Sequence, residues 1–83
     1  MHAMDIPNAI SEIAALVEAD LKKVYFGARP YLDAMYSLKT VDQNYGCDDG
    51  RSIVRYFLVN ARTWKGETAK AVKAKLNELV GNS

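Results

Sequence analysis

The feature that most limits how this chain can fold is the spacing of its apolar residues between positions 51 and 64. They recur every three or four positions, as on one face of an α-helix, and Arg51, Arg55 and Arg62 fall outside that face. The β-branched residues of 52–59 leave a strand as an alternative, which the charge at Arg55 and the three-to-four spacing disfavour. The pattern predicts a helix with these apolar residues on one side: Ile53, Val54, Phe57, Leu58, Ala61 and Trp64.

Three further segments show the same periodicity, at about 7–23, 30–38 and 67–80. Asp5 is placed to cap the first, Pro7 suits its first turn, and Gly81 suits the end of the last. Whether the first two segments form one kinked helix stays open, because Pro30 separates them. We therefore predict a single all-α domain over 1–83, a compact small bundle of about four helices. Its predicted core is Ile13, Val17, Leu32, Met35, Ile53, Phe57, Leu58, Ala61, Val72, Leu76 and Leu79.

The composition fits a small globular domain without covalent cross-links. Hydrophobic residues make up 49% of the 83, yet no apolar run is long enough to span a bilayer. The N-terminus lacks the basic and apolar stretches of a secretory leader. Cys47 is the single cysteine, so an internal disulfide is impossible and a reduced, cytoplasmic setting is expected.

No set of residues in the sequence matches a known catalytic or metal-binding pattern. The single histidine, His2, is far in sequence from Cys47, and one residue of each type cannot fill a zinc site. The loop 42–49 begins like a calcium loop, but Gly46, Cys47 and Ile53 occupy positions that a calcium loop needs for other residues. We expect no cofactor and no metal, and Asp48 or Asp49 to cap the third helix.

Charge is distributed unevenly along the chain. Residues 1–50 hold eight acids and four bases, whereas residues 51–83 hold seven bases and two acids. A basic C-terminal half is typical of a surface for nucleic acid or an acidic partner. A helix-turn-helix reading of 51–80 places Ala61 one position out of register with Gly66, so a solvated basic face is favoured over a recognition helix. The candidate contacts are Arg55, Arg62, Lys65, Lys70, Lys73 and Lys75.

Tyrosines are numerous for so small a core. Surface tyrosines are common contact residues in protein interfaces, although each can also pack its ring at the edge of the core with its hydroxyl in water. The candidate protein contacts are Tyr25, Tyr36, Tyr45 and Tyr56.

Several runs resemble a group of small proteins encoded in bacteriophages and prophages. They are ARPYLDAM at 28–35, Tyr45-Gly46, GRSIV at 50–54, YFL at 56–58 and NARTWKGETA at 60–69. The resemblance covers about residues 28–80 and implies a phage or bacterial setting and an accessory role. It implies no particular catalytic or binding residue.

These features favour a non-enzymatic interaction protein that binds a macromolecular partner, with no membrane association. Nucleic-acid binding through the basic C-terminal half is the alternative, and a small metal-dependent enzyme using Asp42, Asp48 and Asp49 ranks lowest. The uneven charge and the many aromatic residues also predict self-association, most simply as a homodimer.

Overall fold

The protein is all-α, as the periodicity predicts, apart from one very short hairpin. The computed structural model describes residues 6–21, 26–46 and 48–81. Within them lie helices α1 (Ile10–Asp20), α2 (Arg29–Met35), α3 (Gly50–Asn60) and α4 (Glu67–Gly81). The strands β1 (Asn44–Tyr45) and β2 (Asp48–Asp49) pair antiparallel inside the loop before α3. The sequence did not indicate this hairpin, because two residues are too few to show an alternating pattern.

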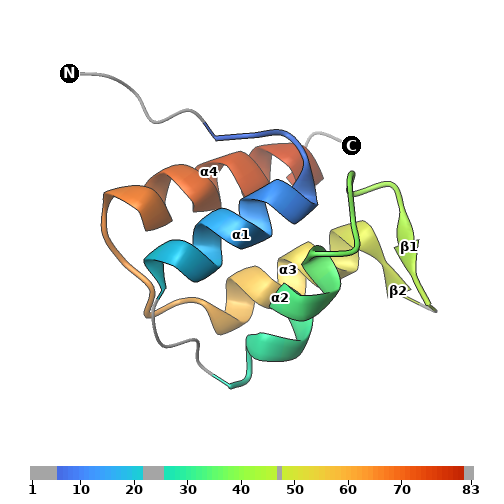
Figure 1. The fold of residues 1–83 in the computed structure, drawn as a ribbon, viewed down its shortest axis with the longest axis horizontal. Helices are drawn as coiled ribbons and strands as arrows, with labels where there is room; N and C mark the ends of the chain where they lie inside the picture. Colours follow the sequence, from blue (N-terminus) through green and yellow to red (C-terminus); the bar gives the residue numbers. More distant parts are fainter. Residues whose placement is uncertain (1–5, 22–25, 47, 82–83) are drawn as a thin grey trace.

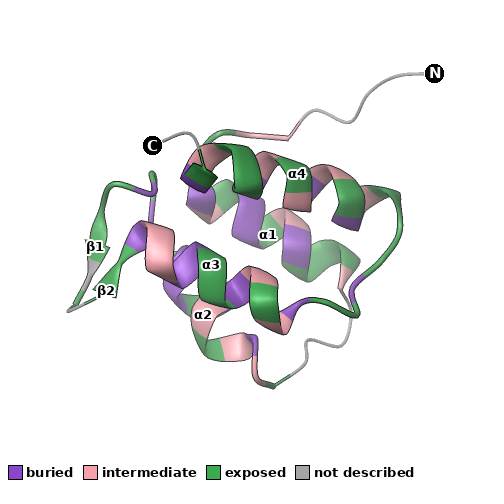
Figure 2. Cartoon of the chain, turned by 180° about the vertical axis from the view of Figure 1, so that it is seen from behind, coloured by how far each residue is buried: buried purple, intermediate pink, exposed green. Residues whose placement is uncertain are grey.

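The helices enclose one core. Helix α1 packs mainly against α2 and α4, and α3 also packs mainly against α2 and α4. Helices α1 and α4 lie side by side and run in opposite directions, with α2 and α3 on the other side and the hairpin at one end (Figure 1). The buried faces of the helices point inward and the exposed faces outward (Figure 2). This arrangement is the compact small bundle expected from four amphipathic segments.

The predicted core residues lie in this interior. Nine of them are buried, and Leu58 and Leu79 are partly buried against the same cluster. Phe57 is the largest of the fully buried side chains. Helical spacing therefore identified the inward-facing positions of all the helices.

Helix α1 begins at Ile10 rather than near Pro7. Its N-cap residue, Ala9, has no side chain that can cap. Instead, the backbone N–H groups of Ile10 and Ser11 donate to the carbonyls of Lys39 and Leu38, at 2.9 and 2.7 Å. The predicted cap, Asp5, lies outside the described residues. The start of α1 is thus fixed by the segment that follows α2, which satisfies two of the unpaired N–H groups at the helix end.

Helices α1 and α2 are separate elements, which answers the question that Pro30 left open. Leu21, with φ −92° and ψ 84°, leaves the helical conformation directly after α1. Helix α2 then starts at Arg29, with Pro30 in its first turn, where the missing N–H costs little. It ends at Met35, three residues before the predicted Leu38.

Helix α3 ends at Asn60, so the prediction that it continues to Trp64 is wrong. Ala61 leaves the helical conformation, with φ −110° and ψ 25°, and the N–H of Trp64 donates to the carbonyl of Ala61 in a turn. Trp64 is nevertheless buried, at 5% exposure. The turn before α4 passes through Gly66 at φ +117°, a conformation that favours glycine.

Gly50, the first residue of α3, lies against the loop that precedes the hairpin. Its N–H donates to the carbonyl of Gln43 at 2.7 Å. A β-carbon at this position would lie 2.7 Å from the carbonyl oxygen of Val41 and 2.9 Å from that of Gln43. Because both atoms belong to the backbone, a larger residue would force the loop away from α3.

We predict that Gly50→Ala lowers the free energy of unfolding by about 1–3 kcal/mol, as overpacking typically does. Urea denaturation followed by circular dichroism measures this change. Gly81→Ala is the matched control, because nothing lies within 4 Å of its added β-carbon. The control should keep or slightly raise stability, and equal losses in the two variants would contradict the close approach at Gly50.

Candidate interaction surface

The outward face of α3 exposes apolar side chains. Val59 is 60% exposed and Tyr56 is 51% exposed, one helical turn apart. Arg55, next to Tyr56 in the chain, and Arg62, two residues beyond the end of α3, are also exposed, so cations flank the apolar positions along the chain. Phe26 is more exposed, at 83%, but it borders residues 22–25, which are not described. We use the name "α3 face" for Arg55, Tyr56, Val59, Asn60, Arg62 and Thr63.

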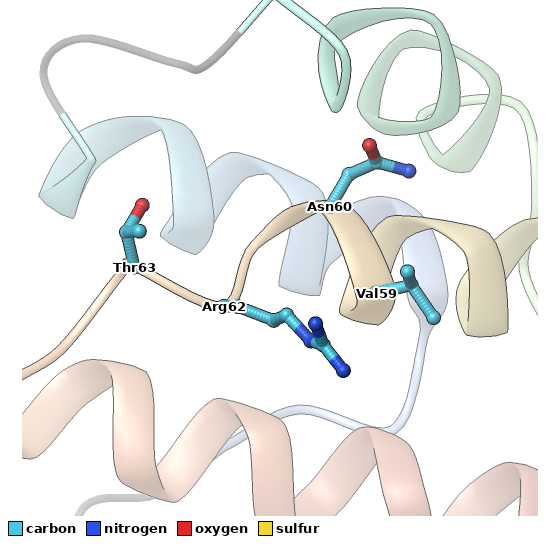
Figure 3. Close-up of a pocket in the computed structure, with 4 residues that line it drawn as sticks. All are labelled: Val59, Asn60, Arg62 and Thr63. Carbon is cyan, nitrogen blue, oxygen red and sulfur yellow. The ribbon is translucent and has the colours of Figure 1, made fainter.

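The α3 face is hollowed at its C-terminal end. An open pocket of about 270 Å³ is lined by Val59, Asn60, Arg62 and Thr63. Arg62 extends on the same side as Val59, whereas Asn60 and Thr63 point away from Arg62 (Figure 3). The side-chain amide of Asn60 donates to the carbonyl of Tyr56 at 2.9 Å, which fixes that side chain on the helix. The lining of the pocket therefore combines the apolar side chain of Val59 with the long cationic side chain of Arg62 and two neutral polar residues, Asn60 and Thr63.

The ring of Tyr56 is supported by α2. Its centroid lies 5.4 Å from that of Tyr31, with the two rings inclined at 42°. Tyr31 is itself partly buried against the core. Aromatic pairs at this separation attract each other, so Tyr31 supports the ring of Tyr56 while Tyr56 remains 51% exposed.

The structure divides the six candidate cations into two groups. Arg55 donates to the carbonyl of Val80 at 3.3 Å, and the ammonium of Lys75 lies 3.8 Å from the carboxylate of Glu78. Lys73 donates to the carbonyl of Trp64 at 2.6 Å. No ion pair within the described residues involves the remaining three, which are Arg62, Lys65 and Lys70.

Tyr36, one of the four candidate tyrosines, belongs to a polar cluster that joins α1 to α2. Its hydroxyl donates to Glu18 at 2.7 Å, and Arg29 donates to both Glu18 and Asp33. Hydrogen bonds from Arg29 and then from Tyr36 hold the pKa of Glu18 below its usual value. The same carboxylate raises the pKa of Tyr36. The hydroxyl of Tyr36 is therefore engaged within the chain, although the residue remains 41% exposed.

The other two candidate tyrosines give no contact surface here. Tyr45 lies in β1, but its side chain is not described, and Tyr25 lies outside the described residues. Tyr56 is thus the candidate tyrosine whose exposed ring the structure places on a defined face.

Trp64 joins three helices, a role that sequence reasoning missed. Its indole N–H donates to the carboxylate of Asp20 in α1 at 2.8 Å, and its ring meets Phe57 of α3 edge-on at 6.5 Å. Lys73 of α4 places its ammonium 5.9 Å from the indole ring. Trp64 and Asp20 are 44 residues apart, so no local pattern could have paired them.

The acids of the loop before α3 make structural contacts. Asp42 pairs with Arg51 at 2.7 Å. Asp49 is the N-cap of α3, where its carboxylate accepts the N–H of Ser52 at 2.7 Å, as predicted for Asp48 or Asp49. Among the described residues, no three histidine, cysteine, aspartate or glutamate side chains lie close enough to hold a metal ion.

Comparisons with protein-family models, with curated proteins and with solved structures find no match to this chain. Among the described helices, none combines the length and apolar character needed to cross a membrane.

We predict that Asp49 makes the protein less stable in acid. The hydrogen bond from the backbone N–H of Ser52 lowers the pKa of Asp49 in the folded state. A lowered folded-state pKa means that this stabilisation is present above the ordinary aspartate value, 3.8, and is lost as the pH falls below it. Urea midpoints measured from about pH 5 to pH 2 should therefore fall less steeply in Asp49→Asn, since asparagine caps without ionising.

The adjacent acid supplies the control for this measurement. Asp48→Asn removes the same charge one residue away but leaves the cap of α3 intact. It should keep the acid dependence of the wild-type chain. Identical pH profiles for Asp49→Asn and the wild type would show that the cap does not contribute through its charge.

Proposed function

We propose that the chain is a small, non-enzymatic interaction protein that binds a partner protein through the α3 face. The observation that carries the proposal is the exposure of Val59 beside Tyr56, next to a pocket, on a helix whose other side is buried in the core. Apolar side chains of this kind contribute to binding by leaving water. Full burial of an aliphatic side chain contributes about 1.5–3 kcal/mol of favourable free energy. Val59 is therefore our candidate for the centre of the contact.

The rigidity of the α3 face supports binding at low entropic cost. Tyr56 is already held by Tyr31, and Asn60 is already bonded to the backbone of α3. Side chains that are fixed before binding lose little conformational freedom when a partner arrives. The α3 face therefore has the preorganised aromatic and polar groups that protein interfaces use.

Charge defines the chemistry of the partner. Arg62 lines the pocket beside Val59, and no acid within the described residues pairs with it. A matching segment presents an apolar side chain to Val59 and a carboxylate to Arg62, whose guanidinium binds carboxylates through two parallel hydrogen bonds. The proposed partner is thus an acidic segment of another protein, and the resemblance to phage and prophage proteins favours a phage or host protein.

We predict that a random-peptide display library selected on the immobilised chain yields peptides rich in acidic and large apolar residues. Val59→Asp should raise the dissociation constant of the selected peptides about tenfold or more, which is a loss of about 1.4 kcal/mol or more in binding free energy. The reason is that the substitution removes the apolar contact and adds a negative charge beside Arg62. Fluorescence polarisation of a labelled selected peptide measures the dissociation constant.

Ala74→Asp is the matched control for this experiment. Ala74 is an exposed residue of α4, so the variant has the same added charge at a site away from the α3 face. Equal weakening by Ala74→Asp and Val59→Asp would contradict the proposed surface. A labelled DNA duplex provides the opposing arm, because tight, steeply salt-dependent DNA binding that Val59→Asp leaves unchanged would favour the nucleic-acid alternative.

Self-association stays a prediction. The contacts of the acidic residues within the chain bear on which surface a dimer would use. Glu18, Asp20, Asp33 and Asp42, all in the acidic half, bond to groups of their own chain. A twofold interface through the α3 face would bring the same arginines of both copies together, because such an interface pairs a patch with itself. A foreign acidic segment therefore fits this face better than a second copy does.

This geometry predicts the salt dependence of any dimer. Pairing through the α3 face should tighten with added salt, because salt screens the repulsion between arginines and leaves the apolar contact. Sedimentation equilibrium at micromolar protein in low and high salt measures it, with Val59→Asp as the variant that should remain monomeric. A dimer that dissociates as salt is added would show that complementary charges, rather than the α3 face, hold the two copies.

A further inference from the structure

A second pocket lies between the end of the turn that follows α3 and the first part of α4. Its volume is also about 270 Å³, and it shares no lining residue with the pocket of the α3 face. Trp64 and Ala69, which are both buried, form its apolar base. The residues that line it are Trp64, Lys65, Gly66, Ala69, Lys70 and Lys73.

Three of the lining side chains are cationic. Lys65 and Lys70 are exposed, and neither is in an ion pair within the described residues. Two acidic residues lie near the lining of this pocket, Asp20 through its bond to Trp64 and Glu67 through its place next to Gly66 in the chain. The carboxylate of Asp20 already accepts the indole N–H of Trp64, and the exposed Glu67 forms no ion pair with any residue that the structure describes. The pocket therefore gathers more positive charge than its surroundings neutralise.

Lys73 differs from the other two lysines because its position is fixed. Its ammonium donates to the carbonyl of Trp64 at 2.6 Å and lies 5.9 Å from the centre of the indole ring. An ammonium has three N–H donors, and this contact uses one of them. Two donors of a positioned cation thus remain for a ligand at the edge of the pocket.

We propose that this pocket binds a phosphate-bearing anion. A phosphate group has several acceptor oxygens and more than one negative charge, so it can engage ammonium groups on several sides, as lysines do in known phosphate sites. A single carboxylate has fewer charges to balance three lysines. The pocket is separate from the α3 face, so this site stands independently of the proposed protein contact.

The single tryptophan of the chain reports on this pocket directly. Titration of the protein with sodium tripolyphosphate should change the fluorescence of Trp64 and saturate, whereas sodium chloride at matched ionic strength should not. Lys65→Gln and Lys70→Gln should each weaken the binding of tripolyphosphate about tenfold, because each removes a charged hydrogen-bond donor to the anion. Val59→Asp should bind tripolyphosphate as the wild type does.

Lys75→Gln is the control for loss of charge alone. Lys75 lies in the same helix, but it pairs with Glu78 and does not line the pocket. Equal weakening by Lys75→Gln and Lys70→Gln would overturn the proposal, as would a fluorescence change that merely follows the salt control. A single-stranded oligodeoxythymidylate, titrated alongside, identifies the source of the phosphate. Displacement of tripolyphosphate by the oligonucleotide indicates a nucleic-acid backbone, and its absence indicates a free phosphate compound.

Discussion

The burial of Trp64 is the constraint on which the rest of the structure depends. The residue follows α3 instead of belonging to it, yet its indole reaches Asp20 at the end of α1 and packs against Phe57. Its carbonyl and ring also hold Lys73 of α4. A buried indole N–H needs an acceptor, and the carboxylate of the exposed Asp20 supplies one. The ends of α1 and α3 and the first half of α4 are thereby fixed relative to one another.

Helix α2 is attached by a different kind of contact. Arg29 bridges Glu18 of α1 and Asp33 of α2, with Tyr36 completing the cluster at the surface. These groups are solvent-exposed, so their ion pairs add little stability and mainly select one orientation of α2. The apolar contacts of α2 with α3 then place Tyr31 under Tyr56, which links this orientation to the shape of the α3 face.

Sequence spacing predicted which positions of each helix face the core, although not where α3 ends. The buried positions of α3 follow from a period of 3.6, and the sequence indicated Asp48 or Asp49 as its cap, of which the structure has Asp49. The start of α1 and the close approach at Gly50 depend instead on carbonyls of the distant segment 38–43. A carbonyl has the same chemistry in every residue, so side-chain patterns contain no information about which carbonyl a distant N–H will find.

The same limit applies to the candidate surfaces. Helical spacing shows that a lysine or arginine faces outward. It does not show whether a carbonyl or carboxylate of another segment lies within hydrogen-bond distance of that side chain. Arg55 and Lys73 meet such acceptors, whereas Arg62 meets none among the described residues, although all three looked alike in sequence.

The two halves of the chain also differ in how their charged residues are paired. Several acids of the first half bond within the chain, to Arg29, Arg51 and the indole of Trp64. Ion pairs within the described residues engage four of the ten acids, Glu18, Asp33, Asp42 and Glu78. In the second half, around the turn between α3 and α4, Arg62, Lys65 and Lys70 by contrast have no ion pair with any described part of the chain. Trp64 holds Lys73 in place, so one positioned cation lies beside the two exposed lysines, and a group that is fixed before binding loses little conformational freedom when a ligand arrives.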